Sequence, residues 1–132
     1  MAKFLIIDDN IVMTSGLLAK MRLAGHEADV VGESTVSEPV ITLARVRQPD
    51  MIVIDPTLDS NRAGYGLISD LKAHPETKDI LIVAYSDLPD LSLRERVLNL
   101  GASTHYDRSS MSAEELIGRL EKIIINKQKY DA

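Results

Sequence analysis

The chain contains no cysteine and no tryptophan, only one phenylalanine, and no basic tract. Without cysteine, neither a disulfide framework nor a thiolate zinc site can form. So few aromatic residues make a base-stacking platform unexpected, and the net charge of -5 disfavours direct nucleic-acid binding. The early apolar run Phe4–Ile7 is ended at once by two acids, so we expect neither a signal peptide nor a membrane span. The default expectation is a cytoplasmic protein.

Short apolar runs rich in β-branched residues alternate with segments of helical periodicity. The chain has 132 residues, enough for one domain, which we expect over residues 1–127 with a polar tail at 128–132. Strands that are apolar on both faces are typical of parallel sheets. The predicted strands are Phe4–Ile7, Ala28–Val31, Met51–Ile54, Ile80–Tyr85 and, more weakly, Thr104–Tyr106.

The intervening segments have helix signals at both ends. Apolar stripes with helical spacing occur at Val36/Val40/Leu43/Ala44, Leu93/Val97/Leu100 and Leu116/Ile117/Leu120/Ile123/Ile124. Capping boxes begin at Thr35 and Ser112, and Asn10 is a candidate cap for a helix from Ile11 to about Ala24. Gly25 and Gly101 are placed as helix-terminating residues.

This alternation predicts an α/β fold in three layers. We expect a flavodoxin-like, doubly wound, five-stranded parallel sheet in the order 2-1-3-4-5, with five helices on its two faces. In that order the first and third strands are neighbours, and the ligand crevice lies at their carboxyl ends.

Carboxylates follow both of these strands. Asp8 and Asp9 end the first strand and Asp55 ends the third, so the strand tips should lie about 5 Å apart. Such acids share a volume of high negative potential, which favours a hard divalent cation, Mg²⁺ rather than Ca²⁺. Asp55 is then a candidate nucleophile for phosphoryl transfer, with the hydroxyl of Ser86 and the cation of Arg108 as supporting groups.

The ordered set of motifs resembles the receiver domain of bacterial two-component response regulators, in particular the single-domain, chemotaxis-type members. The matching pieces are Ile6–Asn10, Ile54–Asp55, Gly64–Tyr65, Leu81–Ser86 and Gly101–Ala102, and the likeness runs from Lys3 to about Lys127. The resemblance implies that Asp55 accepts a phosphoryl group and that Ser86 is the switch hydroxyl. It also implies that Asp8, Asp9, Asp55 and the backbone carbonyl of Thr57 hold Mg²⁺.

The resemblance also implies partners. The phosphoryl donor would be a histidine kinase or a histidine phosphotransfer protein. A downstream protein would bind the face made by the fourth helix, fifth strand and fifth helix. We expect no membrane and no direct nucleic-acid partner, and the sequence leaves homodimer formation open. The domain would assist its own phosphorylation and dephosphorylation without being an enzyme in the usual sense.

Four departures distinguish the chain from the family pattern. Arg108 and Ser109 stand where the family has Lys and Pro, and Arg108 would either pair with Asp55 or clamp the phosphoryl oxygens. Asp87 adds a carboxylate after the switch hydroxyl. The loop from Asp55 to Gly64 is one residue longer than is typical, with Pro56 early in it. His105, next to Tyr106, takes the aromatic switch position.

These departures keep other functions open. The first alternative is a phosphorylation-independent pseudo-receiver that serves as an interaction module; a small metal-dependent phosphohydrolase and a flavin-binding protein are weaker ones. Simpler structural roles also remain. Asp9 and Asn10 can cap a helix, Asp55 can form a turn before Pro56, and Ser86 or Asp87 can cap the next helix. Arg108 can be an ordinary surface cation.

Overall fold

The computed structural model describes residues 1–32, 37–57, 63–87 and 91–131. Its strands form one parallel sheet in the order β2-β1-β3-β4-β5, which confirms the predicted topology. The strands are β1 (Lys3–Ile7), β2 (Glu27–Val31), β3 (Met51–Ile54), β4 (Leu81–Ser86) and β5 (Thr104–Asp107). The helices are α1 (Ile11–Leu23), α2 (Ser37–Arg47), α3 (Ala63–Ala73), α4 (Leu91–Leu100), the 3₁₀ helix η2 (Arg108–Ser110) and α5 (Ala113–Asp131).

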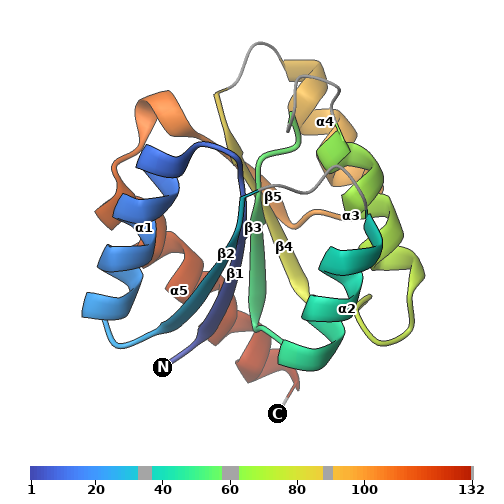
Figure 1. Cartoon of the computed structure of the whole chain (residues 1–132), viewed down its shortest axis with the longest axis horizontal. Helices are drawn as coiled ribbons and strands as arrows, with labels where there is room; N and C mark the ends of the chain where they lie inside the picture. Colours follow the sequence, from blue (N-terminus) through green and yellow to red (C-terminus); the bar gives the residue numbers. More distant parts are fainter. Residues whose placement is uncertain (33–36, 58–62, 88–90, 132) are drawn as a thin grey trace.

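The helices cover the sheet on both sides. Helices α1 and α5 lie on one side, and α2, α3 and α4 lie on the other (Figure 1). This is the three-layer arrangement that right-handed crossovers between parallel strands produce. It places the carboxyl ends of all the strands at one edge of the sheet, where the acids lie.

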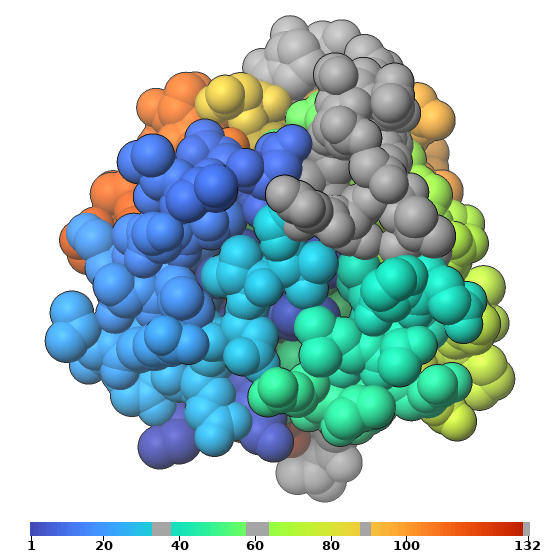
Figure 2. Space-filling view, viewed as in Figure 1, coloured from blue at the N-terminus to red at the C-terminus, as the bar shows by residue number. Residues whose placement is uncertain are grey.

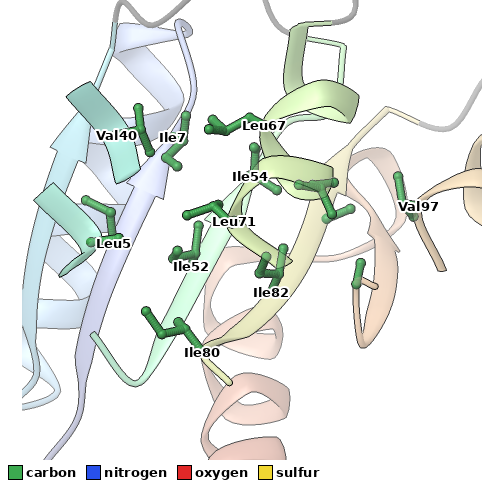
Figure 3. Packing of buried hydrophobic residues seen from close by; sticks show 14 of the residues in the cluster. Leu5, Ile7, Val40, Ile52, Ile54, Leu67, Leu71, Ile80, Ile82 and Val97 are labelled. Atoms are coloured by element: carbon green, nitrogen blue, oxygen red, sulfur yellow. The ribbon is translucent and has the colours of Figure 1, made fainter. Parts of the chain in front are cut away.

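Two apolar clusters, one on each side of the sheet, form the core. The residues of each strand alternate between them, so that Leu5 and Ile7 face α2 and α3 whereas Phe4 and Ile6 face α1 and α5. Figure 3 shows the first cluster, in which Ile52, Ile54 and Ile82 of the central strands pack against α3 and its neighbours. Each such fully buried side chain stabilises the fold by about 1.5–3 kcal/mol relative to its exposed state. The most fully buried strands are β1, β3 and β4, and Asp8 and Asp55 directly follow the first two of these.

Strand β2 is the edge strand next to β1. Figure 2 shows it at the surface between α1 and α2, and its residues Asp29, Val30 and Val31 are only partly buried. The backbone N–H of Asp8 still bonds to the carbonyl of Val31 at 3.2 Å, so the ladder between β1 and β2 continues one residue into the acidic segment. The backbone of Asp8 is therefore fixed by sheet hydrogen bonds.

Most of the predicted helix ends are confirmed. The side chain of Asn10 accepts a hydrogen bond from the backbone N–H of Met13, as an N-cap does. The hydroxyl of Ser112 accepts one from the backbone N–H of Glu115 at 3.2 Å. Gly25 and Gly101 have positive φ angles of 90° and 117°, which terminate the helices before them. The predicted capping box at Thr35 and the loop after Thr57 lie outside the described residues.

The C-terminal segment, expected as a polar tail at 128–132, is helical as far as Asp131. Helix α5 continues beyond Lys127 to Asp131, with Ile124 still buried against the sheet and Lys127 donating to the carbonyl of Asp79. The apolar stripe ends near Ile124, and the helix continues through Lys127, Gln128 and Lys129, which are good helix formers. Of the described residues, no helix is both long enough and apolar enough to cross a bilayer.

Candidate functional site

The acids at the carboxyl edge of the sheet lie on adjacent strands. Ile7 of β1 pairs with Ile54 of β3, so Asp8 and Asp55 each follow a paired, buried residue. The backbone N–H of Asp55 donates to the carbonyl of Ile7 at 3.0 Å. The two side chains therefore project from neighbouring tips, as the sequence predicts.

Asp8 is the most enclosed acid of the site, with 3% of its surface exposed. Its Oδ1 accepts from the backbone N–H of Asn10 at 2.9 Å, and its Oδ2 accepts from Nη2 of Arg108 at 2.5 Å. Burial raises the pKa of the Asp8 carboxyl above its ordinary value, although the Asn10 N–H and the Arg108 charge both act in the opposite direction. The raised pKa means that the ionised Asp8 carboxylate is less favourable here than in water. Such perturbed pKa values are common at functional sites.

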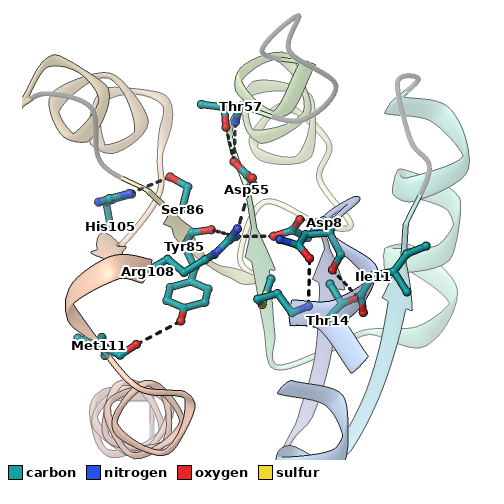
Figure 4. A network of polar contacts seen from close by, with 12 residues as sticks. Asp8, Ile11, Thr14, Asp55, Thr57, Tyr85, Ser86, His105, Arg108 and Met111 are labelled. Atoms are coloured by element: carbon teal, nitrogen blue, oxygen red, sulfur yellow. Dashed lines mark hydrogen bonds and ion pairs between the residues drawn. The ribbon is translucent and has the colours of Figure 1, made fainter. Parts of the chain in front are cut away.

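Asp55 has its two carboxylate oxygens in different surroundings. Its Oδ1 accepts from the backbone N–H of Thr57 at 2.8 Å and from the Thr57 hydroxyl at 2.7 Å. Its Oδ2 lies 3.8 Å from Nη2 of Arg108. One oxygen is thus occupied by hydrogen bonds, and the other faces the cation and the Asp8 carboxylate (Figure 4).

Arg108 lies between the two acids. It begins η2, whose preceding residue Asp107 caps it by accepting from the backbone N–H of Ser109. In addition to its hydrogen bond to Asp8, Nη2 of Arg108 donates to the carbonyl of Tyr85 at 2.9 Å. The Cζ atom of Arg108 lies 5.1 Å from the centre of the Tyr85 ring. The Nε atom is buried and has no hydrogen-bond partner among the described residues.

These contacts correct one part of the sequence interpretation. We expected Arg108 to pair with Asp55, to clamp phosphoryl oxygens or to be a surface cation; it does lie 3.8 Å from Asp55, but its closer ionic partner is Asp8, and at 17% exposure its side chain is not a surface cation. The η2 turn directs the side chain over Tyr85 toward β1, a direction that the sequence does not reveal. Arg108 is therefore a component of the acidic site.

The predicted switch residues are also brought together. Ser86, at the end of β4, is 2% exposed and its hydroxyl lies 3.1 Å from Nε2 of His105 on β5. Arg94 of α4 donates to the carbonyl of His105 at 2.7 Å. Burial, and after it the Arg94 charge, lower the pKa of His105 below its ordinary value. His105 therefore links two elements: its imidazole contacts Ser86 at the tip of β4, and its backbone carbonyl accepts from Arg94 of α4.

Asp9 and Asp87 lie at the periphery of the site. Both are exposed at the carboxyl edge of the sheet. Within the described residues, no three acidic or histidine side chains come together as a ready metal-binding group. The predicted grouping of Asp8, Asp9 and Asp55 is thus present as two converging carboxylates with a third acid nearby in the sequence.

The carboxylate oxygens of Asp8 and Asp55 are nevertheless of the chemical type that Mg²⁺ prefers as ligands. Asp8 and Asp55 each present an anionic oxygen to the same small region, and Mg²⁺ typically takes one or two carboxylates and keeps several waters. In this structure a guanidinium nitrogen contacts the Asp8 oxygen. The residues therefore fit a magnesium ion only once Arg108 has moved from Asp8.

Three contributors to the site were not predicted. They are the Thr57 side chain, the Tyr85 carbonyl and Arg94. The sequence contains a signal for the first, because an Asp whose side chain bonds to the backbone two residues later is a common turn. The other two contacts depend on how η2 and α4 pack, which local sequence does not specify.

Comparison with known proteins finds the same fold in solved structures. No family model matches the chain, and no curated protein matches its sequence. Similar solved structures include a putative response regulator from Chloroflexus aurantiacus, with 24% identity, a TM-score of 0.80, and coverage of 94% of this chain and 98% of that one. The chemotaxis protein CheY4 of Vibrio cholerae has 18% identity and a TM-score of 0.80, with coverage of 92% of this chain and 98% of that one.

A third similar structure is the receiver domain of a sensor histidine kinase from Pseudomonas aeruginosa. It has 21% identity and a TM-score of 0.77, with coverage of 93% of this chain and 97% of that one. That crystal structure has a magnesium ion coordinated in its active-site cleft. The present chain has the fold of a response regulator receiver domain over nearly its whole length.

Proposed function

We propose that the chain is a two-component signalling receiver that accepts a phosphoryl group on Asp55 and thereby alters a protein-binding face. The observation that carries this proposal is the orientation of Asp55, whose Oδ1 is held by Thr57 while Oδ2 faces the cation of Arg108. Among the described residues no hydrogen bond reaches Oδ2, and a carboxylate oxygen in that state beside a fixed positive charge is suited to attack a phosphoryl group.

The reaction is a transfer to Asp55 Oδ2. This oxygen forms a bond to the phosphorus of a phosphohistidine, and the phosphorus–nitrogen bond breaks with its electron pair going to the imidazole nitrogen. The product is an acyl phosphate on Asp55, which water later cleaves to restore the carboxylate. Arg108 is close enough to Asp55 to meet the added negative charge.

Mg²⁺ is the proposed cofactor. Asp8, Asp9, Asp55 and the backbone carbonyl of Thr57 are the groups that would hold it. When bound, the ion neutralises the oxygens of the incoming phosphoryl group. Asp8 contributes a buried oxygen whose negative charge favours a cation, and Asp9 can join from the exposed edge.

The switch would start at Ser86. Its hydroxyl now bonds to His105, and a phosphoryl oxygen on Asp55 offers it a stronger, charged acceptor. The loss of this bond would leave His105 free to change its position in β5. Because Arg94 bonds to the His105 carbonyl, the change reaches α4 and the face that α4, β5 and α5 form. A downstream protein that prefers the altered face would then shift the equilibrium.

The pseudo-receiver is the second candidate. The Arg108–Asp8 ion pair favours it, because this contact neutralises the site without phosphate or metal. The exposed carboxylate of Asp87, next to the switch hydroxyl, also opposes an incoming anion. In either version we propose a signalling module and not an enzyme that turns over a separate substrate.

Intact mass spectrometry separates the two candidates. The protein is incubated with MgCl₂ and acetyl phosphate as wild type, as Asp55→Asn and as Asp70→Asn. Asp70 is an exposed residue of α3, so its substitution removes the same charge away from the site. We expect wild type and Asp70→Asn to gain one phosphoryl mass and Asp55→Asn to gain none. A folded wild-type protein that gains no mass would favour the pseudo-receiver.

A further inference from the structure

Arg108 is held at the site by more than one attraction. Its Nη2 donates to Asp8 Oδ2 and to the carbonyl of Tyr85, and its guanidinium lies over the Tyr85 ring. The Tyr85 hydroxyl in turn lies 3.4 Å from the carbonyl of Met111, which keeps the ring in place. The position of the arginine is thus determined by β1, β4 and the segment after η2 together.

The contact with Asp8 is costly to break. Asp8 is almost fully buried and the Arg108 side chain is 17% exposed, so separating them leaves a charge in a poorly hydrated place. Charge-assisted hydrogen bonds are also about twice as strong as neutral ones. The Asp8 oxygen is therefore not freely available to another cation.

We propose that Arg108 is a built-in competitor of the divalent cation, so that withdrawal of its guanidinium from Asp8 sets the affinity of the site for Mg²⁺. This inference rests on the proposed function for the identity of the cation. A guanidinium nitrogen at 2.5 Å already fills the coordination space of Asp8 Oδ2, and two cations on one oxygen repel each other. Arg108 must leave Asp8 before that oxygen can coordinate an ion.

Among the described residues, Asp55 is the next anionic group within reach of the displaced arginine. Its Oδ2 lies 3.8 Å from the same nitrogen, so a small rotation carries the guanidinium from one acid to the other. The Nε atom, which has no partner among the described residues, is a further donor for that position. The arginine thus couples the occupation of Asp8 to the charge on Asp55, and a phosphoryl group on Asp55 would draw Arg108 away from Asp8.

Isothermal titration of MgCl₂ into unphosphorylated protein tests the proposal. The variants are Arg108→Ala and Arg108→Gln, and Arg47→Ala is the control. Arg47 forms an ion pair with Asp29 on the surface, so Arg47→Ala also removes one positive charge from an arginine–aspartate pair. We expect both Arg108 variants to bind Mg²⁺ at least about fivefold more tightly than wild type, the lower range of typical coupling between two sites. The control should stay within about twofold of wild type, because its charge is exposed and screened. Equal or weaker binding by the folded Arg108 variants overturns the proposal.

A measurement on the wild-type protein covers the case in which the variants do not fold. The arginine Nε–Hε signal of Arg108 is followed by NMR during the same titration. We expect it to shift along with Mg²⁺ occupancy, and an unchanged signal at saturation overturns the proposal. No phosphoryl donor is present, so competition can be observed even if Asp55 is never phosphorylated. Conversely, a phosphorylated Asp55 with unaltered Mg²⁺ affinity in Arg108→Ala refutes this inference alone.

Discussion

Gly64, in the first turn of α3, lies against the backbone of Asp55 and Pro56. Gly64→Ala therefore tests how closely α3 packs on the segment that carries Asp55. A Cβ at Gly64 would lie 2.5 Å from the Cα of Pro56 and 2.6 Å from the carbonyl oxygen of Asp55. Both atoms are backbone atoms that cannot rotate away, and one belongs to a rigid proline ring system. Overpacking of this kind usually costs about 1–3 kcal/mol, and we expect the upper end.

Gly66 provides the matched control. It lies two residues further along α3, is exposed, and a Cβ there would have no neighbour within 4 Å. Gly66→Ala should therefore stabilise the protein by about 0.5–1 kcal/mol through helix propensity alone. The same chemical change at two positions in one helix is thus expected to have opposite signs and to differ by about 4 kcal/mol.

Urea unfolding followed by far-ultraviolet circular dichroism measures this difference. The midpoint gives the change in stability if the slope with denaturant is the same for all three proteins. The packing argument fails if Gly64→Ala unfolds within about 0.5 kcal/mol of wild type, the usual range of a surface substitution. It also fails if Gly66→Ala is the less stable of the two variants.

Three further perturbations test the core, the buried acid and the buried histidine. Leu120→Ala should cost about 2–5 kcal/mol in urea unfolding because Leu120 is fully buried, whereas Ile125→Ala on the same helix, at 49% exposure, should change stability by only about 0.5 kcal/mol. Asp8→Asn should lower the melting temperature, because it leaves the poorly hydrated Arg108 charge without its ion-pair partner, and it should abolish phosphoryl transfer; a higher melting temperature would contradict this. The folded-state pKa of His105 is lowered, so its contribution to stability is complete above about pH 6.5 and is lost as pH falls from there toward the folded pKa. His105→Phe should flatten that part of the stability–pH curve, and a wild-type slope in the variant would contradict the assignment.

The sheet order and the adjacency of the acids could be derived from the sequence. Nearly continuous apolar runs such as Met51–Ile54 are diagnostic of strands covered on both faces, and alternation with helices leaves few topologies. Once β1 and β3 are neighbours, Asp8 and Asp55 must share an edge. The caps at Asn10 and Ser112 were predictable for a similar reason, because a cap acts within one helical turn.

The partners of the site's polar side chains could not be derived in the same way. Arg108 has a long side chain with several rotamers, and its choice of Asp8 over Asp55 depends on the η2 turn and the Tyr85 ring. The contact between Ser86 and His105 depends on the register of β4 and β5, in which Ala84 pairs with His105. Such contacts arise from packing between distant segments, and periodicity within one segment does not encode them.

The exposed rim of β2 bears on how these molecules behave at high concentration. An unpaired strand edge offers a row of backbone donors and acceptors on which another extended chain can assemble. Glu27 and Asp29 place two negative charges along this short strand, and Arg47 balances one of them. Two such rims brought together would repel each other, so the strand resists fibril-like growth without needing a covering helix.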